Sequence, residues 1–336
     1  IFEGQSRMET GTLTYSTISF NSAFVKSNSR NGFSSDVFNT LLDNRKAVSE
    51  NLGLRNGNSN KLSSGYYSGY DGTQQEVVIG SFLTAFTGNE VNEKNVNPLK
   101  NIPLPNWTVN YNGLTKFEKT KKYVKNFVIK HGYTSSVSVA GLQTNLNAQN
   151  DANGNPAALD LNNNYIVNRQ IQTVTISERF SPLIGIDATW NVKGQGLITK
   201  FEFKKDRNAS LSLANNQVTE IMGKEIVIGT GYKFSKVKFK KIKALSKYPA
   251  SDINFRFDFS FRDNLTVVRK IAENTNQATA GQTIVSIKSS LDYNIGQNVT
   301  VVLYYDQVIN TPKIASSYPT ANTSAGLRIR LNLAGL

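Results

Sequence analysis

The chain has 336 residues, with 38 Lys or Arg against 24 Asp or Glu, a formal net charge of +14, no cysteine and one histidine. These counts exclude a disulfide framework, a thiolate zinc site, a cysteine nucleophile and any site that needs two imidazoles. No stretch approaches the roughly 18 to 20 consecutive apolar residues of a membrane-spanning helix, so a membrane location would require strands. The opening Ile1-Phe2-Glu3-Gly4 has neither an initiator Met nor a signal-peptide pattern, and we expect a mature or cut product.

The first third mixes weak strand signals, near Leu13 and Trp107, with helical ones. Ser35-Asp36, followed by apolar residues at helical spacing and by Gly53, predicts a capped amphipathic helix. Residues 74–86 and 116–124 predict a second and a short third helix. We therefore assign residues 1–125 to early strands with helical insertions, and we expect these helices inside a wide lumen or below a barrel.

Period-two alternation dominates residues 126–336, which predicts sequential long β-hairpins. In the clearest case, Ile253 to Arg262, one face carries five large apolar groups and the other carries polar or charged ones. The phase continues to Ile271, so this strand is about 18 residues long, far beyond the usual five or six of globular strands. With its weaker repeats, the pattern predicts about ten to twelve strands. Residues 144–168, rich in Asn, and 235–250, rich in Lys, are expected to be loops.

A soluble sandwich would also alternate, but its strands are shorter. Strands this long, with aromatic and aliphatic groups on one face and glycines and charges on the other, favour an all-β fold of antiparallel transmembrane barrel strands. Each face then has a predicted environment. The residues expected to face lipid are Phe255, Phe257, Phe259, Phe261, Leu327, Ile329 and Leu331, and those expected to face the lumen are Arg256, Asp258, Arg262, Arg328 and Arg330.

Other motifs are weak. Gly229-Thr230-Gly231 lacks the third glycine of a dinucleotide loop, and Asp151, Asn153 and Asn155 lack the later ligands of a calcium loop. The Lys-rich run after Lys233 has no nucleic-acid recognition motif beside it, so we expect no nucleic-acid partner. His131 falls on the apolar phase and is expected to be interfacial or packed, not catalytic. No nucleophile, base and orienting group can be assembled, so we expect no enzyme, no cofactor and no metal site.

Several segments in fixed order resemble the C-terminal region of the SprA/Sov proteins. The resemblance covers nearly the whole chain and depends on ordered spacing. Its segments are 103–114, 131–133, 178–187, 216–220, 229–232, 257–264, 276–277 and 304–306.

The resemblance implies the outer-membrane translocon of the Bacteroidota type IX secretion system, which exports folded cargo carrying a C-terminal signal, and surface adhesins in gliding bacteria. It implies a very large single-chain barrel with a lateral opening, of which this chain is the C-terminal portion. Implied partners are the rest of the barrel, a PorV-like barrel protein, a periplasmic plug protein and the lipid bilayer.

Two alternatives stay open from the sequence. A barrel formed by this chain alone would be a small-solute porin or transporter, with a lumen too narrow for folded cargo. A soluble surface adhesin of sandwich type would produce the same alternation.

Overall fold

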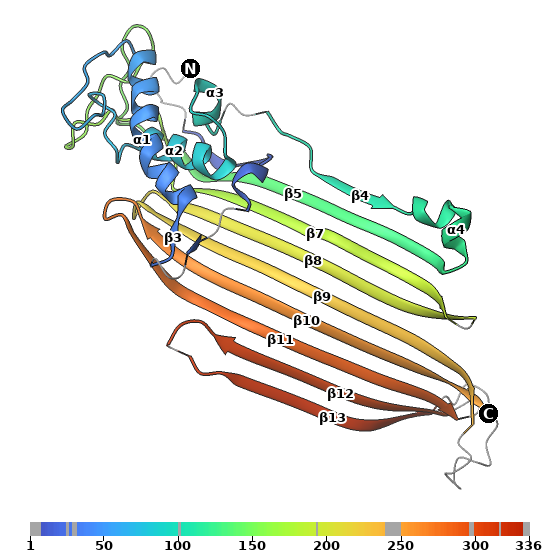
Figure 1. The fold of residues 1–336 in the computed structure, drawn as a ribbon. Helices are drawn as coiled ribbons and strands as arrows, with labels where there is room; N and C mark the ends of the chain where they lie inside the picture. Colours follow the sequence, from blue (N-terminus) through green and yellow to red (C-terminus); the bar gives the residue numbers. More distant parts are fainter. Residues whose placement is uncertain are drawn as a thin grey trace, which may run out of the picture.

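The computed structural model describes residues 8–24, 27–28, 32–99, 102–192, 194–238, 250–295, 299–315 and 317–331. Within them, one 11-stranded sheet dominates, and its main path runs β1-β5-β7-β8-β9-β10-β11-β12-β13 with every neighbouring pair antiparallel (Figure 1). The all-β prediction is confirmed. The sheet is open in this part of the chain, because β1 and β13 lie at its two ends.

Eight strands of 12 to 21 residues form the body of the sheet. From β7 onward each pairs with the next in sequence, as the predicted hairpins require. Their length follows from uninterrupted alternation in the sequence. They are β5 (Val124–Thr144), β7 (Thr173–Val192), β8 (Gln195–Ser212), β9 (Gln217–Val237), β10 (Ser251–Lys270), β11 (Thr275–Ile295), β12 (Val299–Pro312) and β13 (Thr320–Leu331).

The edge beside β5 is made of two short strands in line, β1 (Thr10–Ser16) and β4 (Trp107–Tyr111). The chain leaves the sheet between them and returns about 90 residues later. Ser135 of β5 closes the gap: its carbonyl accepts from Thr17 N at 3.0 Å, and its N–H donates to Asn106 Oδ1 at 2.8 Å. Residues 17–106, here termed the helical unit, are thus an insertion between two strands that occupy the same edge of the sheet.

The helical unit contains α1 (Asp36–Arg55), α2 (Gln75–Thr87) and α3 (Glu93–Val96), with the 3-10 turn η1 (Phe20–Ser22) and the two-residue strands β2 (Ser27–Asn28) and β3 (Ser34–Ser35). Outside it lie η3 (Gly113–Lys116), α4 (Glu118–Lys121) and β6 (Arg169–Gln170). All three predicted helices are present, but α4 covers only Glu118–Lys121 of the predicted 116–124. Ser35 is the N-cap residue of α1, but its side chain makes no capping hydrogen bond. Gly53 does not end α1 as expected, because the helix continues to Arg55.

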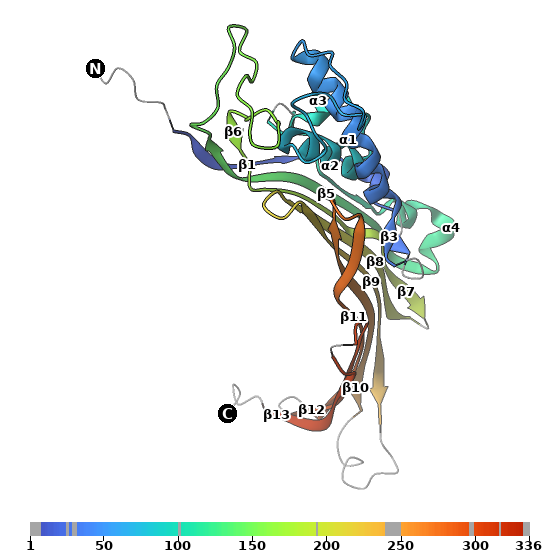
Figure 2. The ribbon, with the colours of Figure 1, turned by 90° about the vertical axis from the view of Figure 1, so that its left-hand side faces the viewer.

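Because the sheet is open in the described residues, it stays a prediction whether the helices lie inside a wide lumen or below a barrel. They pack on the face of the sheet that carries the large apolar residues, at one end of the strands, and Figure 2 shows them on the convex side of the curved sheet. A buried core joins the two layers, because α1 and α2 each present an apolar stripe that must leave water. This core combines Phe38, Leu41, Phe82 and Phe86 from the helices with Val137, Val174, Ile176, Leu211 and Val218 from the strands.

The two predicted loops have different outcomes. Residues 145–168 contain only turns and isolated bridges, such as Asn150 with Pro156, which confirms the first loop. In the second region β9 continues to Val237, so its start is strand. Residues 239–249, with Lys240, Lys241, Lys243 and Lys247 of the Lys-rich run, lie outside the described residues.

Candidate functional site: two faces of one sheet

The strand registers separate the predicted residues into two sets on opposite faces. Phe255 lies beside Tyr232 and Leu291, whereas Arg256 lies beside Gly231 and Ser290. We call the side of Phe255 the convex face and the side of Arg256 the concave face. The registers assign all residues expected to face lipid to the convex face, and those expected to face the lumen to the concave face; whether lipid or water meets them stays a prediction.

The convex face carries apolar side chains in rows that cross the strands. One row runs through neighbouring register pairs from β7 to β12: Ile184, Phe203, Ile226, Phe261, Val285 and Ile309. A parallel row near the other strand end contains Trp190, Leu197, Tyr232, Phe255, Leu291, Leu303 and Leu327. Ile184, Leu303 and Leu327 are exposed, at 51%, 55% and 61%, and the other side chains of the two rows are half-buried. A contiguous exposed apolar surface of this kind marks an interaction face.

The height of this apolar surface can be estimated along β11. From Val285 to Ile295, which pairs with Val299 of β12, the strand advances about ten residues, or about 33 Å at about 3.3 Å per residue. At the usual tilt of barrel strands, about 40°, this spans about 25 Å along the barrel axis. The apolar band of outer-membrane barrels is about 25 Å tall.

The concave face carries charged side chains that pair within and between strands, together with exposed apolar residues such as Ile198 and Ile221. Lys130 of β5 contacts Asp187 of β7, and Lys204 of β8 lies 3.2 Å from Glu202 and 3.6 Å from Glu225 of β9. Most of these side chains are partly exposed. Solvent therefore screens each ion pair, and each contributes little to stability. The concave face therefore carries charges of both signs.

The predicted concave residues take part in this pattern. Arg262 lies 3.8 Å from Asp206, and Asp258 faces Lys288 across the β10–β11 register. Gly229 beside Asp258 has a structural role: a Cβ there would lie 2.8 Å from the Asp258 carboxylate, so glycine leaves room for that charge. No dinucleotide loop forms at Gly229, because it lies inside β9.

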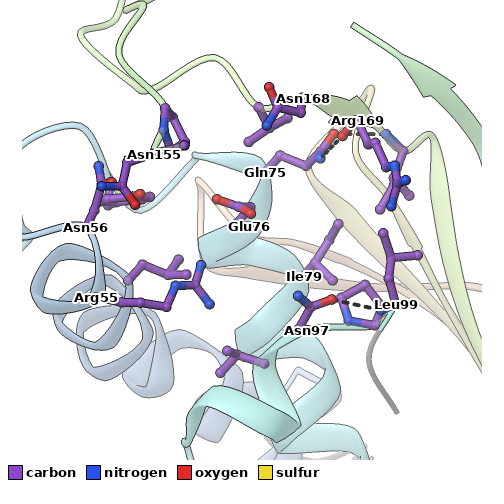
Figure 3. Close-up of a pocket in the computed structure, with 18 residues that line it drawn as sticks. Arg55, Asn56, Gln75, Glu76, Ile79, Asn97, Leu99, Asn155, Asn168 and Arg169 are labelled. Carbon is purple, nitrogen blue, oxygen red and sulfur yellow. Dashed lines mark hydrogen bonds between the residues drawn. The ribbon is translucent and has the colours of Figure 1, made fainter. Parts of the chain in front are cut away.

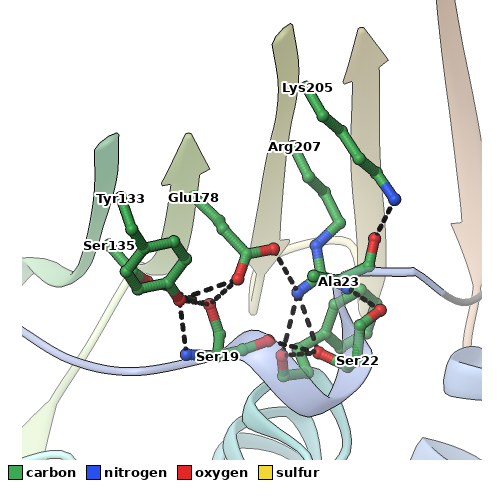
Figure 4. A network of polar contacts seen from close by, with 9 residues as sticks. Ser19, Ser22, Ala23, Tyr133, Ser135, Glu178, Lys205 and Arg207 are labelled. Atoms are coloured by element: carbon green, nitrogen blue, oxygen red, sulfur yellow. Dashed lines mark hydrogen bonds and ion pairs between the residues drawn. The ribbon is translucent and has the colours of Figure 1, made fainter. Parts of the chain in front are cut away.

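A buried polar cluster fastens the helical unit to the sheet (Figure 4). The Glu178 carboxylate accepts hydrogen bonds from Ser19 and Tyr133, both at 2.8 Å, and lies 3.3 Å from Arg207. Arg207 in turn donates to the carbonyls of Ser22 and Phe86, at 2.9 and 3.1 Å. A strand arginine therefore binds the C-terminal end of α2, where the helix dipole and free carbonyls favour a cation.

A second buried arginine repeats this arrangement two strands further along the sheet. Arg269 of β10, fully buried, donates through two nitrogens to Glu220 of β9, at 2.7 and 2.9 Å. It also donates to the carbonyl of Phe33 at 2.6 Å and lies against the ring of Phe38. Sequence analysis missed both clusters. The sequence did contain a signal for them: single charged residues, opposite in sign on adjacent strands, interrupt the apolar phase.

A cavity of 450 Å³ lies between α1, α2 and the chain around residues 154–171 (Figure 3). The Glu76 carboxylate points into it, and burial raises the pKa of this group, with Arg55 nearby partly opposing the shift. Gln75 supports the wall by donating to the Arg169 carbonyl and accepting from Ile171 N. The cavity therefore combines a carboxylate and a guanidinium on the helical unit.

The remaining motif residues have local structural roles. His131 Nδ1 lies 2.7 Å from the Leu183 carbonyl and its ring lies near Trp107, so the histidine is packed. Asp151 accepts from the N–H groups of Asn153 and Asn155, at 2.9 and 2.8 Å, which shapes a polar turn and lowers the pKa of Asp151. Within the described ranges, no three acidic or histidine side chains gather as a metal site would require.

Comparison with protein-family models and with curated proteins finds no match for the chain. Among the described residues, no helix combines the length and the apolar character needed to cross a membrane.

Proposed function

We propose that this chain is a wall segment of a non-enzymatic, protein-conducting barrel in the bacterial outer membrane, the translocon of type IX secretion. The observation that carries the proposal is the 11-stranded antiparallel sheet, with an apolar convex face that extends over about ten residues of each long strand, a charged concave face and two edges that do not meet. The resemblance to the SprA/Sov proteins supplies the transported substrate, folded cargo with a C-terminal signal. It also supplies the PorV-like and periplasmic plug partners.

The open sheet favours this proposal over a porin formed by the chain alone. In the described residues β1 and β4 form one edge and β13 the other, and neither edge pairs with a further strand. An unpaired edge in hydrocarbon leaves backbone groups without partners, at several kcal/mol each. In a bilayer these edges need strands from elsewhere in a larger barrel. A sandwich adhesin is also disfavoured, because no second large sheet covers the apolar rows among these residues.

The test uses two adjacent residues of β13 in the full-length gene product. Ile329, 59% exposed, lies on the convex face beside Val301, and Arg328 lies on the concave face beside Val302. We expect Ile329→Asp to reduce both cargo secretion and the amount of barrel in the outer membrane, because it exposes a charge to hydrocarbon. Arg328→Gln is the matched control and is expected to leave both unchanged. Equal behaviour of the two variants, or failure of detergent to extract the protein from the outer-membrane fraction, contradicts the proposal.

A further inference from the structure

The apolar surface of the convex face ends at a row of charged residues. Lys205 of β8 lies beside Lys224 of β9, which lies beside Asp263 of β10, whose neighbour on β11 is Thr283. Lys313, just after β12, approaches the same carboxylate at 2.5 Å. We call Lys205, Lys224, Asp263 and Lys313 the charged row.

On the convex face, apolar side chains are followed directly by charged ones at the next position of the same face. Phe203, Ile226 and Phe261 occupy the positions two residues from Lys205, Lys224 and Asp263 on the same three strands. On the other side of the row, Arg207 and Glu178 already lie beneath the helical unit. The charged row is therefore the border between the apolar surface and the part of the convex face that protein covers.

The charges of the row do not cancel. The Asp263 carboxylate forms ion pairs with two ammonium groups, that of Lys313 at 2.5 Å and that of Lys224 at 3.5 Å. It also accepts a hydrogen bond from the Thr283 hydroxyl at 3.0 Å. Lys205 is engaged elsewhere, since it donates to the Ala23 carbonyl and lies 4.3 Å above the ring of Phe24. One positive charge is left between Lys224 and Lys313. Both side chains reach solvent, with the Lys224 side chain 58% exposed.

We infer that Lys224 and Lys313 bind the phosphate of an anionic lipid headgroup at the edge of the bilayer, with the helical unit lying just outside the membrane on that side. This inference rests on the proposed function. Lysine stems lie along apolar surface while their ammonium groups reach toward water and phosphate, which suits residues one step from Phe261 and Ile226. A cation near an anionic lipid surface contributes about fivefold in binding per residue.

The experiment reconstitutes the full-length protein in vesicles of phosphatidylethanolamine with a minor share of phosphatidylglycerol. After detergent extraction, the ratio of the two lipids retained by the protein is measured. Removing both lysines, by Lys224→Gln with Lys313→Gln, is expected to lower the phosphatidylglycerol preference about fivefold for each lysine. Asp263→Asn is expected to raise it, because the competing carboxylate is lost. Lys288→Gln, on the concave face beside Asp258, is the matched control and is expected to change nothing.

An unchanged ratio in the double variant, or an equal decrease with Lys288→Gln, overturns the inference. A lower phosphatidylglycerol preference in Asp263→Asn also overturns the inference. The carboxylate would then have a purely structural role in the charged row and would not compete with lipid phosphate. A separate probe tests the proposed function: a fluorophore at Phe257→Cys, quenched by lipids brominated on their acyl chains. Quenching with an unchanged lipid ratio refutes the headgroup site alone, whereas absence of quenching refutes the membrane wall itself.

Discussion

Glu178 of β7 lies directly opposite Arg207 of β8, and the two side chains form an ion pair that is almost fully buried beneath the helical unit. On a bare convex face in hydrocarbon this pair would be costly to desolvate. Here Ser19 and Tyr133 donate to the carboxylate and Ser22 accepts from the guanidinium, of which Nε alone lacks a partner among the described residues. The helical unit and the buried polar cluster therefore depend on each other.

We expect Glu178→Ala to loosen the helical unit from the sheet. The change leaves the Arg207 guanidinium buried without its carboxylate, which typically costs about 3 to 5 kcal/mol. Hydrogen–deuterium exchange in α2 should rise markedly, while exchange in β10 should not. Glu225→Gln is the control: it breaks the more exposed contact with Lys204, worth at most about 1 kcal/mol. Equal protection of α2 in both variants would show that the Glu178 ion pair does not hold the unit.

Cysteine scanning along β10 should report the two faces directly. We expect a water-soluble thiol reagent to label positions 256, 258 and 262 of the assembled protein, and to label 255, 257 and 261 weakly or not at all. The reason is that successive strand residues point to opposite faces, one toward the lumen and one toward hydrocarbon. Quantified labelling in intact outer membranes is the measurement. Labelling without alternation contradicts the assignment of the convex face to lipid.

Gly53 provides a test of packing within the helical unit. Glycine to alanine inside a helix normally stabilises by about 0.5 to 1 kcal/mol. At Gly53, however, the new Cβ would lie 2.7 Å from Tyr67 Cδ1, and overpacking typically costs about 1 to 3 kcal/mol. We therefore expect Gly53→Ala to destabilise the unit, measured as increased exchange in α1.

The sign of this effect should reverse when the obstruction is removed. In a Tyr67→Gly background, which also removes the Tyr67 Cβ that would lie 2.8 Å from the new methyl, Gly53→Ala is expected to stabilise α1, because only the helix propensity remains. A destabilising effect of the same size in both backgrounds would show that contact with Tyr67 is not the reason for a glycine at position 53.

Glu76 predicts a pH dependence of the helical unit. Burial raises its pKa in the folded chain above the ordinary 4.5, so the folded state holds the proton more tightly than the unfolded state. Its contribution is therefore fully favourable below pH 4.5 and is lost as the pH rises through the higher folded pKa. We expect Glu76→Gln to stabilise the unit at pH 7 and to have little effect at pH 4, measured by protease resistance of residues 36–87. A variant that is equally stabilised at both pH values would contradict this linkage.

The sequence alone determined the strands and the separation of their faces. Alternation is a local property: once Ile253 to Arg262 is extended, Phe255 and Arg256 must point to opposite sides. The helix at Ser35-Asp36 was also local, because its cap and apolar spacing lie within one segment. These features needed no knowledge of distant residues.

Only the tertiary structure decided where the helices lie and what the isolated charges do. The sequence pattern of α1 and α2 shows an apolar stripe but not which surface covers it, so it did not show that the helices pack on the convex face of the sheet. Likewise Lys205 and Arg207 interrupted an apolar phase without a visible reason. Their partners, Ala23, Ser22 and Phe86, are more than 100 residues away in the sequence. Such contacts follow from the curvature and register of the whole sheet, which no local pattern specifies.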